Sequence, residues 1–291
     1  MKLMNKTLLF IPMYNCKNQI VRVLSQLDEK VCRYISEVIV VDNGSTDGGR
    51  ESVKAFLEDA APFLPRISLL LNDENYGLGG SHKVAFNYAV KNQFDYVIVL
   101  HGDDQGDIKD LLPYLRSGMA YKYDSFLGSR FEKNSVLVNY APVRIVGNHI
   151  FNVFMTFMLG RRISDLGSGL NMYRVNYLRS GFYRSFTNTL SFNVYMLIYG
   201  IYSGSRFRFF PLSWREDDQV SNARFLKQTL EIAGITFSYL INKRAAMTRK
   251  YVRSLPYSYS VVCDNRSLQS LKEDTVAGEE FKDTKEPEDE T

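Results

Sequence analysis

The first half of the chain alternates short apolar runs with stretches of helical periodicity, and this alternation strongly constrains the fold. Apolar runs that are rich in β-branched residues and bounded by turn formers predict strands at residues 8–11, 38–41, 67–71 and 96–100. Between them, apolar residues at helical spacing predict helices at residues 18–30, 48–57 and 80–91. Strands joined through helices run parallel, with right-handed crossovers. We therefore expect an α/β fold with a Rossmann-like, mostly parallel sheet flanked by helices.

Polar residues gather where these predicted strands end, which is where such sheets bind their ligands. The fourth strand runs into an acidic cluster, VIVLHGDDQGD, that contains Asp103, Asp104 and Asp107. His101 and Gln105 lie among these aspartates. Carboxylates this close together repel one another and raise each other's pKa unless a cation lies between them. The cluster is therefore either a solvated loop or a site that holds a metal ion.

The ends of the first and second strands carry candidate nucleotide contacts. In the segment IPMYNC, Pro12 ends the strand because it lacks an N–H donor, Tyr14 offers an aromatic face to a base, and Asn15 caps the next helix. In VVDNGS, Asp42 can accept hydrogen bonds from a base edge or from ribose hydroxyls, and Asn43 begins a turn. Each of these segments by itself is equally compatible with an ordinary strand-to-helix turn.

A glycine-rich segment, NDENYGLGGSH, follows the third strand and opens a helix. Backbone that includes Gly77 can approach a ligand closely there, and a helix N-terminus favours anions. By itself this pattern is only weakly specific.

Charge is unevenly distributed along the chain. Residues 267–291 contain nine acidic and three basic residues, a net charge of about −6, whereas the whole chain carries +4. That segment has too few large apolar side chains to offset its ordering entropy, so we predict a disordered tail. Residues 1–266 then carry about +10, which favours anionic partners such as nucleotide phosphates, a membrane surface or nucleic acid. A soluble surface without such a partner is an equally simple interpretation.

Cysteine content and hydropathy predict a location. Cys16, Cys32 and Cys263 are too few and too scattered for a disulfide framework or a zinc site. No signal-peptide pattern opens the sequence, and no apolar run approaches the length of a bilayer span. We expect a reducing, cytoplasmic location, and contact with the inner face of the membrane remains open.

Together, the segments FIPMYN, VIVVDNGSTDGG, NYGLGGS and VIVLHGDDQ resemble, in this order and spacing, the family 2 glycosyltransferases of the GT-A fold. FLGSRF (126–131) and ISDLGSGLNMYR (163–174) look like segments of the dolichyl- and polyprenyl-phosphate mannose and glucose synthases. The resemblance covers about residues 7–225. It implies a nucleotide-sugar-binding catalytic domain at 1–222, followed by an amphipathic helical region at 223–266 and the acidic tail at 267–291.

The resemblance implies an inverting transfer of sugar from a nucleotide-diphosphate sugar, with a divalent cation held by an Asp-x-Asp motif. Here that triplet is His101-Gly102-Asp103, so histidine replaces the first aspartate. Asp103 and Gln105 would supply oxygen ligands to Mg²⁺ or Mn²⁺, and His101 would contact the nucleotide or add a nitrogen ligand. The residues expected to bind the donor are Pro12, Tyr14, Asn15, Asp42, Asn43, Gly77, His101, Gly102 and Trp214.

Three further residues are expected to act in the reaction. Arg130 would share the charge on the leaving diphosphate. Arg215, in a segment that resembles the synthases' phosphate-closing loop, would contact phosphate, and Trp214 beside it would stack. Asp165 would act as a general base if the acceptor is a sugar hydroxyl. A lipid phosphate is already an anionic nucleophile, and Asp165 would then orient groups or help to hold the metal.

The acceptor predicted from the sequence is a polyprenyl phosphate or a glycan hydroxyl, with a slight preference for the lipid phosphate. Two apolar stretches, 145–160 and 192–202, suit either a membrane surface or a core. Residues 223–253 predict a basic amphipathic helix that lies on anionic lipid or packs on the body. The arginines expected beside the first stretch are Arg144, Arg161, Arg162 and Arg174.

Two other functions are alternatives to a glycosyltransferase. A nucleotidyltransferase typically carries a glycine-rich loop with a lysine after its first strand, and PMYNCKN has no glycine. A catalytically degenerate nucleotide-binding scaffold is suggested by His101, by Asn171 in place of the family's arginine, and by Asn222 in place of its lysine. Nucleic acid is not a predicted partner of the glycosyltransferase, and no oligomeric state is predicted.

Overall fold

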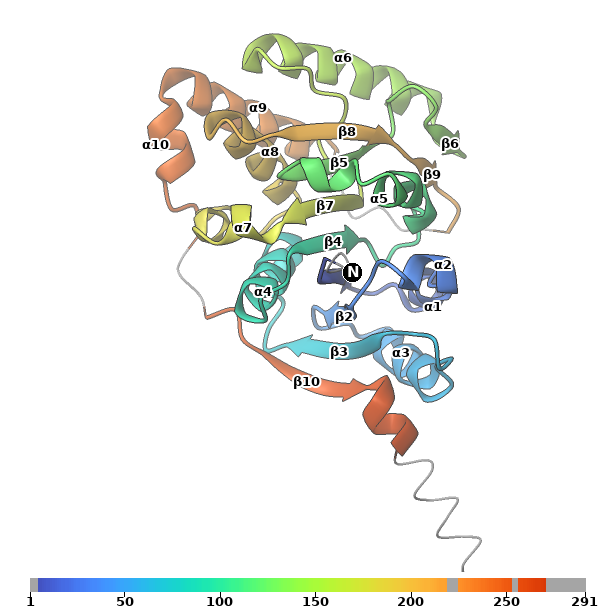
Figure 1. The fold of residues 1–291 in the computed structure, drawn as a ribbon. Coiled ribbons are helices and arrows are strands. Elements are labelled where there is room, and N and C mark those ends of the chain that lie inside the picture. The colour runs from blue at the N-terminus through green and yellow to red at the C-terminus, as the bar shows by residue number, and fades with distance from the viewer. Residues whose placement is uncertain (1–4, 219–224, 253–255, 271–291) are drawn as a thin grey trace, which may run out of the picture.

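The computed structural model describes residues 5–218, 225–252 and 256–270 and is built around one twisted sheet (Figure 1). The strands are β1 (Thr7–Met13), β2 (Glu37–Asp42), β3 (Arg66–Asn72), β4 (Tyr96–Leu100), β5 (Ser125–Ser129), β6 (Val136–Val138), β7 (Leu170–Arg174), β8 (Phe207–Pro211), β9 (Ser213–Arg215) and β10 (Tyr259–Asp264). The α-helices are α1 (Lys17–Ser25), α2 (Glu29–Cys32), α3 (Gly49–Glu58), α4 (Gly77–Lys91), α5 (Leu112–Arg116), α6 (Pro142–Leu159), α7 (Val175–Leu178), α8 (Phe192–Tyr202), α9 (Phe225–Ile241) and α10 (Lys243–Thr248). Short 3₁₀ helices are η1 (Ile108–Leu111), η2 (Ala120–Lys122) and η3 (Phe182–Ser185).

The main sheet has the strand order β10-β3-β2-β1-β4-β7-β5-β8, and β6 pairs with β9 in a small second sheet. Strands β3, β2, β1 and β4 are parallel, whereas β7 runs antiparallel between β4 and β5, and β10 runs antiparallel beside β3. The carboxyl ends of β1, β2, β3 and β4 therefore meet at one edge of the sheet. This is the edge where the sequence placed its polar segments.

All four predicted strands are confirmed, but two local predictions are wrong. Strand β1 continues past Pro12, because Met13 still pairs with Asp42 of β2. The helix predicted at 18–30 is two helices, since Asp28 begins α2 by accepting hydrogen bonds from the N–H groups of Lys30 and Val31. A short acidic side chain that caps a new helix thus ends the longer helical pattern.

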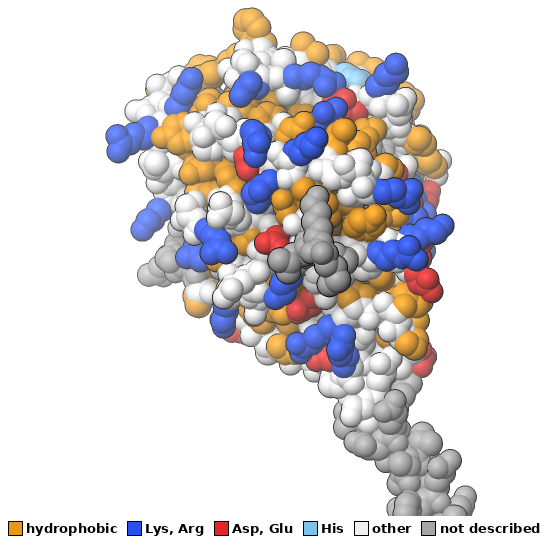
Figure 2. All heavy atoms as spheres, viewed as in Figure 1, with side chains coloured by type: hydrophobic (Ala, Val, Ile, Leu, Met, Phe, Trp, Pro, Cys, Tyr) orange, Lys and Arg blue, Asp and Glu red, His pale blue; other side chains and the backbone are white. Residues whose placement is uncertain are grey.

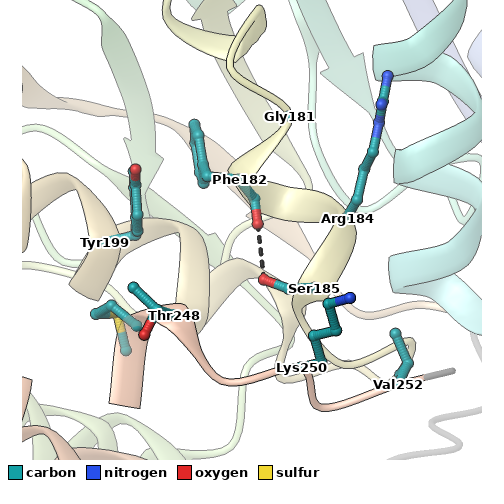
Figure 3. Close-up of a pocket in the computed structure, with 9 residues that line it drawn as sticks. Gly181, Phe182, Arg184, Ser185, Tyr199, Thr248, Lys250 and Val252 are labelled. Atoms are coloured by element: carbon teal, nitrogen blue, oxygen red, sulfur yellow. Dashed lines mark hydrogen bonds between the residues drawn. The ribbon is translucent and has the colours of Figure 1, made fainter. Parts of the chain in front are cut away.

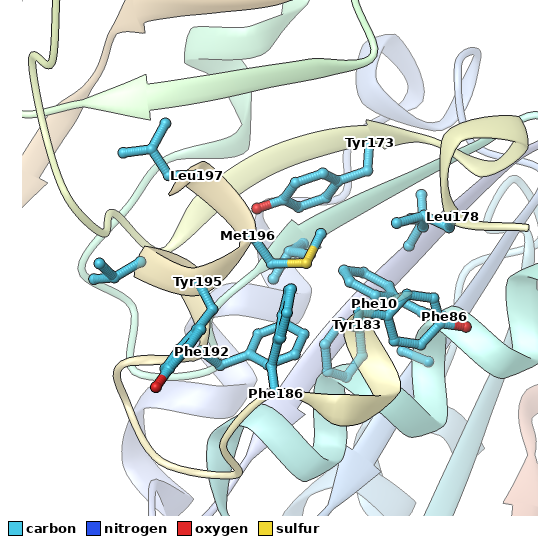
Figure 4. Close-up of a cluster of buried hydrophobic side chains, with 14 of the residues drawn as sticks. Phe10, Phe86, Tyr173, Leu178, Tyr183, Phe186, Phe192, Tyr195, Met196 and Leu197 are labelled. Atoms are coloured by element: carbon cyan, nitrogen blue, oxygen red, sulfur yellow. The ribbon is translucent and has the colours of Figure 1, made fainter. Parts of the chain in front are cut away.

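Alternation along β1 divides the core between the two faces of the sheet. Leu8 and Phe10 pack in the cluster that includes helices α4 and α8, whereas Leu9 and Ile11 pack against α1 and α3. The first cluster is dominated by aromatic rings, among them Phe86, Tyr183, Phe186 and Phe192 (Figure 4). Both faces of the sheet are therefore covered, as the run of fully buried residues in β1 requires.

The two apolar stretches that suggested a membrane surface differ in the structure. Helix α8, at 192–202, is mostly buried and belongs to the core. Helix α6, which contains the 145–160 stretch except for its last residue, buries only Asn152, Met155 and Leu159. Figure 1 shows α6 at the β8 end of the sheet, away from β10. Within the described ranges, no helix combines the length and apolar character needed to cross a bilayer.

The C-terminal region is less helical than the sequence indicated. The helix predicted at 223–253 is divided into α9 and α10 by Asn242, whose side chain accepts a hydrogen bond from the N–H of Ala245. Residues 259–264 form strand β10 in the main sheet, although the sequence indicated only helices in 223–266. Residues 265–270 are helical, so the predicted tail is not disordered at its start. Residues 271–291 and Asn222 lie outside the described residues.

Candidate active site

Close contact between two strand ends builds the centre of the site. The N–H of Gly102, just after β4, donates to the carbonyl oxygen of Pro12 in β1 at 3.1 Å. A Cβ at position 102 would lie 2.7 Å from that oxygen, so only glycine fits without a shift of the backbone. The N–H of His101 donates to the carbonyl oxygen of Gly169 at 2.9 Å. Residues 101 and 102 thus join the β1 end to the SDLGSG segment.

Within the acidic cluster, Asp104 is neutralised by two arginines of the protein itself. Asp104 is fully buried, with a positive φ of 60°, and accepts hydrogen bonds from Arg22 Nε at 2.6 Å and Gln26 Nε2 at 3.0 Å. Arg215 forms a second ion pair with the same carboxylate. Asp107 caps η1 through the N–H of Lys109. The two arginines thus neutralise Asp104, and Asp107 serves as the cap of η1.

Asp103 has no basic side-chain partner within the part of the chain that the structure describes, and unlike Asp107 it caps no helix. Its Oδ1 accepts a weak hydrogen bond of 3.3 Å from the N–H of Gln105. Burial raises the pKa of Asp103 to about 6, and the adjacent Asp104 carboxylate adds to the effect. A carboxylate in this condition gains from a bound cation.

Asp103 and Gln105 supply oxygen donors of the kind that Mg²⁺ and Mn²⁺ prefer, so their chemistry fits the predicted cation. In the described ranges, no group of three or more His, Cys, Asp and Glu side chains is arranged to hold a metal ion. The protein therefore offers only part of a coordination shell, and diphosphate oxygens and water would have to complete it.

His101 is a neutral ring that packs against the core. Burial lowers its pKa to about 4, and its Nε2 has no hydrogen-bond partner among the described residues. The ring centroid lies 6.0 Å from that of His82, and a Cβ on Gly169 would lie 3.0 Å from the His101 ring. His101 thus adds no charge where the family's first aspartate would add one.

The predicted nucleotide residues fall into two groups. Tyr14 is 45% exposed and presents its ring to solvent, as a base contact requires. Asp42 has no exposed surface, and its carboxylate accepts hydrogen bonds from the N–H of Ser45 and from Arg50 Nε, both at 2.8 Å. Asn43 is also buried, and its Oδ1 accepts a hydrogen bond from the N–H of Tyr76 at 2.9 Å. In this structure both residues shape the loops rather than present free acceptors.

Two predictions for the loops around the site are wrong. Asn15 does not cap α1: its Oδ1 accepts from the N–H of Thr46, and Asp47 accepts from the N–H of Lys17 instead. Gly77 does not leave room for a ligand, because a Cβ there would lie 2.5 Å from the carbonyl oxygen of Asn188. The protein's own loop before α8 fills the space beside the glycines.

Arg130 and Asp165 form a buried ion pair. Arg130 Nε donates to Asp165 Oδ2 at 2.8 Å and Nη2 donates to Oδ1 at 2.7 Å, while the backbone N–H of Arg130 donates to Oδ2 at 3.0 Å. Burial opposes the charge on Asp165, yet its pKa falls below the ordinary value because Arg130 outweighs that cost. A carboxylate with a lowered pKa and both oxygens engaged is a poor general base.

The expected roles of Trp214 and Arg215 also change. Trp214 is only 6% exposed, and the Arg130 guanidinium lies 5.1 Å from its ring, so the ring has no free face for a base. Arg215 pairs with Asp104, and its backbone N–H donates to the carbonyl oxygen of Gln105 at 3.0 Å. Trp214 and Arg215 thus hold the acidic turn against β9.

A second arginine, Arg144, lies beside the ion pair. Its guanidinium lies 4.7 Å from the ring centroid of Tyr140, whose hydroxyl accepts a hydrogen bond from Arg130 Nη1 at 3.3 Å. The sequence indicates Arg144 only as a basic neighbour of an apolar stretch. Arg174 is in the wrong place for that group, because it pairs with Tyr96 at the opposite end of β4.

A pocket of about 340 Å³ lies elsewhere, between η3, α8 and the α10 region (Figure 3). Phe182, Tyr199, Thr248 and Lys250 are among its lining residues. None of the predicted site residues lines it.

Comparisons with known proteins identify the family. The family described as glycosyl transferase family 2 matches residues 9–182. An undecaprenyl-phosphate mannosyltransferase of Micrococcus luteus is 26% identical over 175 residues, which are 60% of this chain and 69% of that protein. A polyprenol monophosphomannose synthase of Mycolicibacterium smegmatis is 24% identical over 173 residues, 58% of this chain and 62% of that protein. The chain thus spans roughly two thirds of the length of these relatives.

Solved structures confirm the predicted GT-A fold. Glucosyl-3-phosphoglycerate synthase from Mycobacterium tuberculosis, in complex with Mn²⁺, uridine diphosphate and glucosyl-3-phosphoglycerate, aligns with a TM-score of 0.52. The alignment covers 89% of both chains at 14% identity. At this identity the likeness concerns the fold alone.

The raised pKa of Asp103 predicts a pH-dependent cost to stability. An unfolded aspartate ionises near pH 4, whereas folded Asp103 ionises at about 6, so the unfolded state loses its proton first. Between these values, rising pH therefore lowers the free energy of unfolding. With EDTA present, Asp103→Asn should raise the melting temperature above that of the wild type by an amount that grows from pH 4 to pH 7. Circular dichroism melts measure this, with the exposed Asp73→Asn as control. A difference that does not vary with pH would contradict the assignment.

Proposed function

Because the match over residues 9–182 covers more than half of the chain, the protein belongs to glycosyltransferase family 2, and from this premise we propose its acceptor. We propose that it transfers a sugar from a nucleoside-diphosphate sugar to a polyprenyl phosphate at a membrane surface. The single observation that carries the choice of acceptor is the buried ion pair between Arg130 and Asp165.

The two acceptor classes differ in whether they need a general base, and the ion pair occupies the candidate base. A sugar hydroxyl must lose its proton as the new bond forms, and Asp165 is the candidate base. Its carboxylate is instead held by Arg130 through both oxygens and is nearly inaccessible, with 3% exposure. A phosphate monoester is already an anion near neutral pH and needs no such base. Its oxygen attacks the anomeric carbon as the bond to the nucleoside diphosphate breaks, and the configuration inverts.

Arg144 is the better candidate to hold the acceptor phosphate. The Arg130 side chain is 13% exposed and saturated by Asp165, whereas the Arg144 side chain is 37% exposed. Tyr140 orients Arg144 by stacking beneath its guanidinium. A planar guanidinium pairs well with phosphate because two of its N–H groups can bind two oxygens at once.

On the donor side, Tyr14 provides an exposed ring for the base, and Asp103 and Gln105 would hold Mg²⁺ or Mn²⁺ together with the diphosphate. When bound, such a cation offsets the charge that develops on the departing diphosphate. The solved relative with the same fold contains Mn²⁺ and uridine diphosphate, which supports a divalent cation here.

An exposed apolar face on α6 supports a lipid-linked acceptor. This face consists of Val143, Val146, Ile150, Val153 and Phe157, which are between 58% and 84% exposed. Their spacing places them on one side of the helix. Figure 2 shows hydrophobic side chains interspersed with many basic and few acidic ones on the face in view. Apolar and basic side chains together favour binding to the surface of an anionic membrane.

The apolar face and Arg144 belong to the same helix but lie on different sides of it. Arg144 is in helical register with the inward-facing Asn152, Met155 and Leu159, whereas Val143 and Val146 begin the exposed face. A prenyl chain would therefore pass around the first turn of α6 to reach the apolar face from a phosphate on Arg144. The names of the two relatives include undecaprenyl phosphate and polyprenol monophosphomannose, which supports the same class of acceptor.

Replacing Arg144 tests the phosphate site. Loss of a hydrogen bond to a charged group costs about 1.5–3 kcal/mol, so Arg144→Ala should raise the KM for the prenyl phosphate by roughly ten- to a hundredfold. The KM for the donor should stay unchanged. The matched control is Arg161→Ala, which removes an exposed arginine just past the opposite end of α6. Steady-state assays with varied acceptor measure both. Equal effects of the two substitutions would remove Arg144 from the site.

Replacing Phe157 tests the membrane contact. Phe157 is 84% exposed on the apolar face, and burying such a ring in lipid contributes about 1.5–3 kcal/mol. Phe157→Asp should therefore reduce sedimentation with vesicles that contain anionic lipid by about tenfold or more, whereas Phe63→Asp, an exposed ring between α3 and β3, should not. Binding of the wild type should weaken as salt rises. Equal vesicle binding by both variants would show that α6 does not contact the membrane.

A further inference from the structure

Three consecutive carboxylates follow β9 and tie this segment to three separate parts of the protein. Glu216 pairs with Arg144 of α6, Asp217 Oδ1 accepts from Asn139 Nδ2 at 2.7 Å, and Asp218 pairs with Arg22 of α1 at 2.7 Å. We call residues 216–218 the acidic strap. Glu216 and Asp218 each bind an arginine, and the arginine bound by Glu216 is the proposed phosphate site.

The contact between Glu216 and Arg144 uses the guanidinium incompletely. Nη1 of Arg144 alone reaches both carboxylate oxygens of Glu216, at 2.7 and 2.6 Å. A forked pair would use two nitrogens and two oxygens in parallel, which is the stronger arrangement. The Glu216 side chain is 22% exposed, so an incoming anion can reach this ion pair from solvent.

The surroundings of Arg144 are already built for an anion. Tyr140 supports the guanidinium from one side, and Asn148 Nδ2 donates to the Tyr140 hydroxyl at 3.1 Å, which fixes the ring. Glu216 is near enough to act electrostatically on Arg130 as well. One carboxylate thus neutralises the region where the proposed function needs a phosphate.

On the basis of the proposed function, we propose that Glu216 is an internal competitor that holds the place of the acceptor phosphate on Arg144. A phosphate monoester that binds Arg144 replaces one anion by another, so the arginine never loses its counter-ion. The displaced carboxylate turns toward solvent, while Arg215 and Asp218 keep the segment anchored to Asp104 and Arg22. A neutral acceptor cannot make this exchange, since it would leave both Arg144 and Glu216 unpaired. Glu216 therefore sets the affinity for the acceptor and favours acceptors that carry a phosphate.

Titration of a short prenyl monophosphate, geranyl phosphate, into the full chain tests this inference. Glu216→Gln removes the competing charge but keeps an amide oxygen for Arg144. It should lower the Kd for geranyl phosphate by about three- to tenfold. The incoming phosphate then no longer has to break a partly exposed ion pair, and it no longer meets a carboxylate of like charge. Asp217→Asn is the matched control, because it makes the same charge change one residue away, at a carboxylate that accepts a hydrogen bond from the amide of Asn139. The affinity of Asp217→Asn for geranyl phosphate should equal that of the wild type. Both variants should bind uridine diphosphate as tightly as the wild type does.

A double-mutant cycle shows whether Glu216 acts through Arg144. In an Arg144→Ala background, Glu216→Gln should no longer tighten the binding of geranyl phosphate. Equal affinity of the wild type and Glu216→Gln, or equal tightening by Asp217→Asn, would overturn the role of Glu216 and leave the proposed acceptor intact. Failure of every variant, including the wild type, to bind geranyl phosphate would instead overturn the proposed acceptor, and this inference with it.

Discussion

Each carboxylate buried at the active edge of the sheet needs a cation, and this constraint organises the site. Three of these carboxylates are fully or almost fully buried, and each is paired with an arginine from its own surroundings: Asp42 with Arg50, Asp104 with Arg22 and Arg215, and Asp165 with Arg130. Burial of an unpaired charge would cost several kcal/mol, so these arginines are structural necessities. Asp103 is left without a basic partner in the described part of the chain, and it is the residue that the family motif assigns to the metal. Pairing by the protein thus accounts for the three buried carboxylates and leaves Asp103 available for the proposed cation.

The same constraint limits the chemistry. An aspartate that stabilises a buried arginine cannot also accept a proton readily, because its ionised form is favoured. Asp165 therefore positions Arg130 and the SDLGSG segment, and the proposed acceptor supplies its own negative charge. The partly exposed cation at the proposed acceptor site is Arg144, which lies over the Tyr140 ring and pairs with Glu216, the proposed replaceable counter-ion. The proposed donor and acceptor sites are linked by Arg215, which contacts the acidic turn and directly precedes the acidic strap.

Local patterns predicted the strands and the edge of the sheet where polar residues meet, because hydrophobic alternation and turn chemistry act over a few residues. They did not predict which aspartate of the acidic cluster is paired with arginine. Arg22 and Arg215 reach Asp104 from distant parts of the sequence, and no local pattern encodes that pairing. Gly77 failed for the same reason, since the segment that fills the space beside it, around Asn188, belongs to a later loop. Strand β10 was missed because only its antiparallel pairing with β3, about 190 residues earlier in the chain, gives it a sheet to join.

The account's central claim is that sugar is joined to a lipid phosphate without a protein base. Mass spectrometry of the lipid fraction tests it most directly, after incubation of the full chain with a prenyl monophosphate, Mn²⁺ and a panel of nucleoside-diphosphate sugars. The account predicts a new phosphodiester whose mass is that of the prenyl phosphate plus one glycosyl unit, formed at a rate that does not rise with pH above 7 and abolished by EDTA. Unchanged prenyl phosphate, together with sugar transfer to a hydroxyl acceptor at a rate that rises with pH, would contradict it.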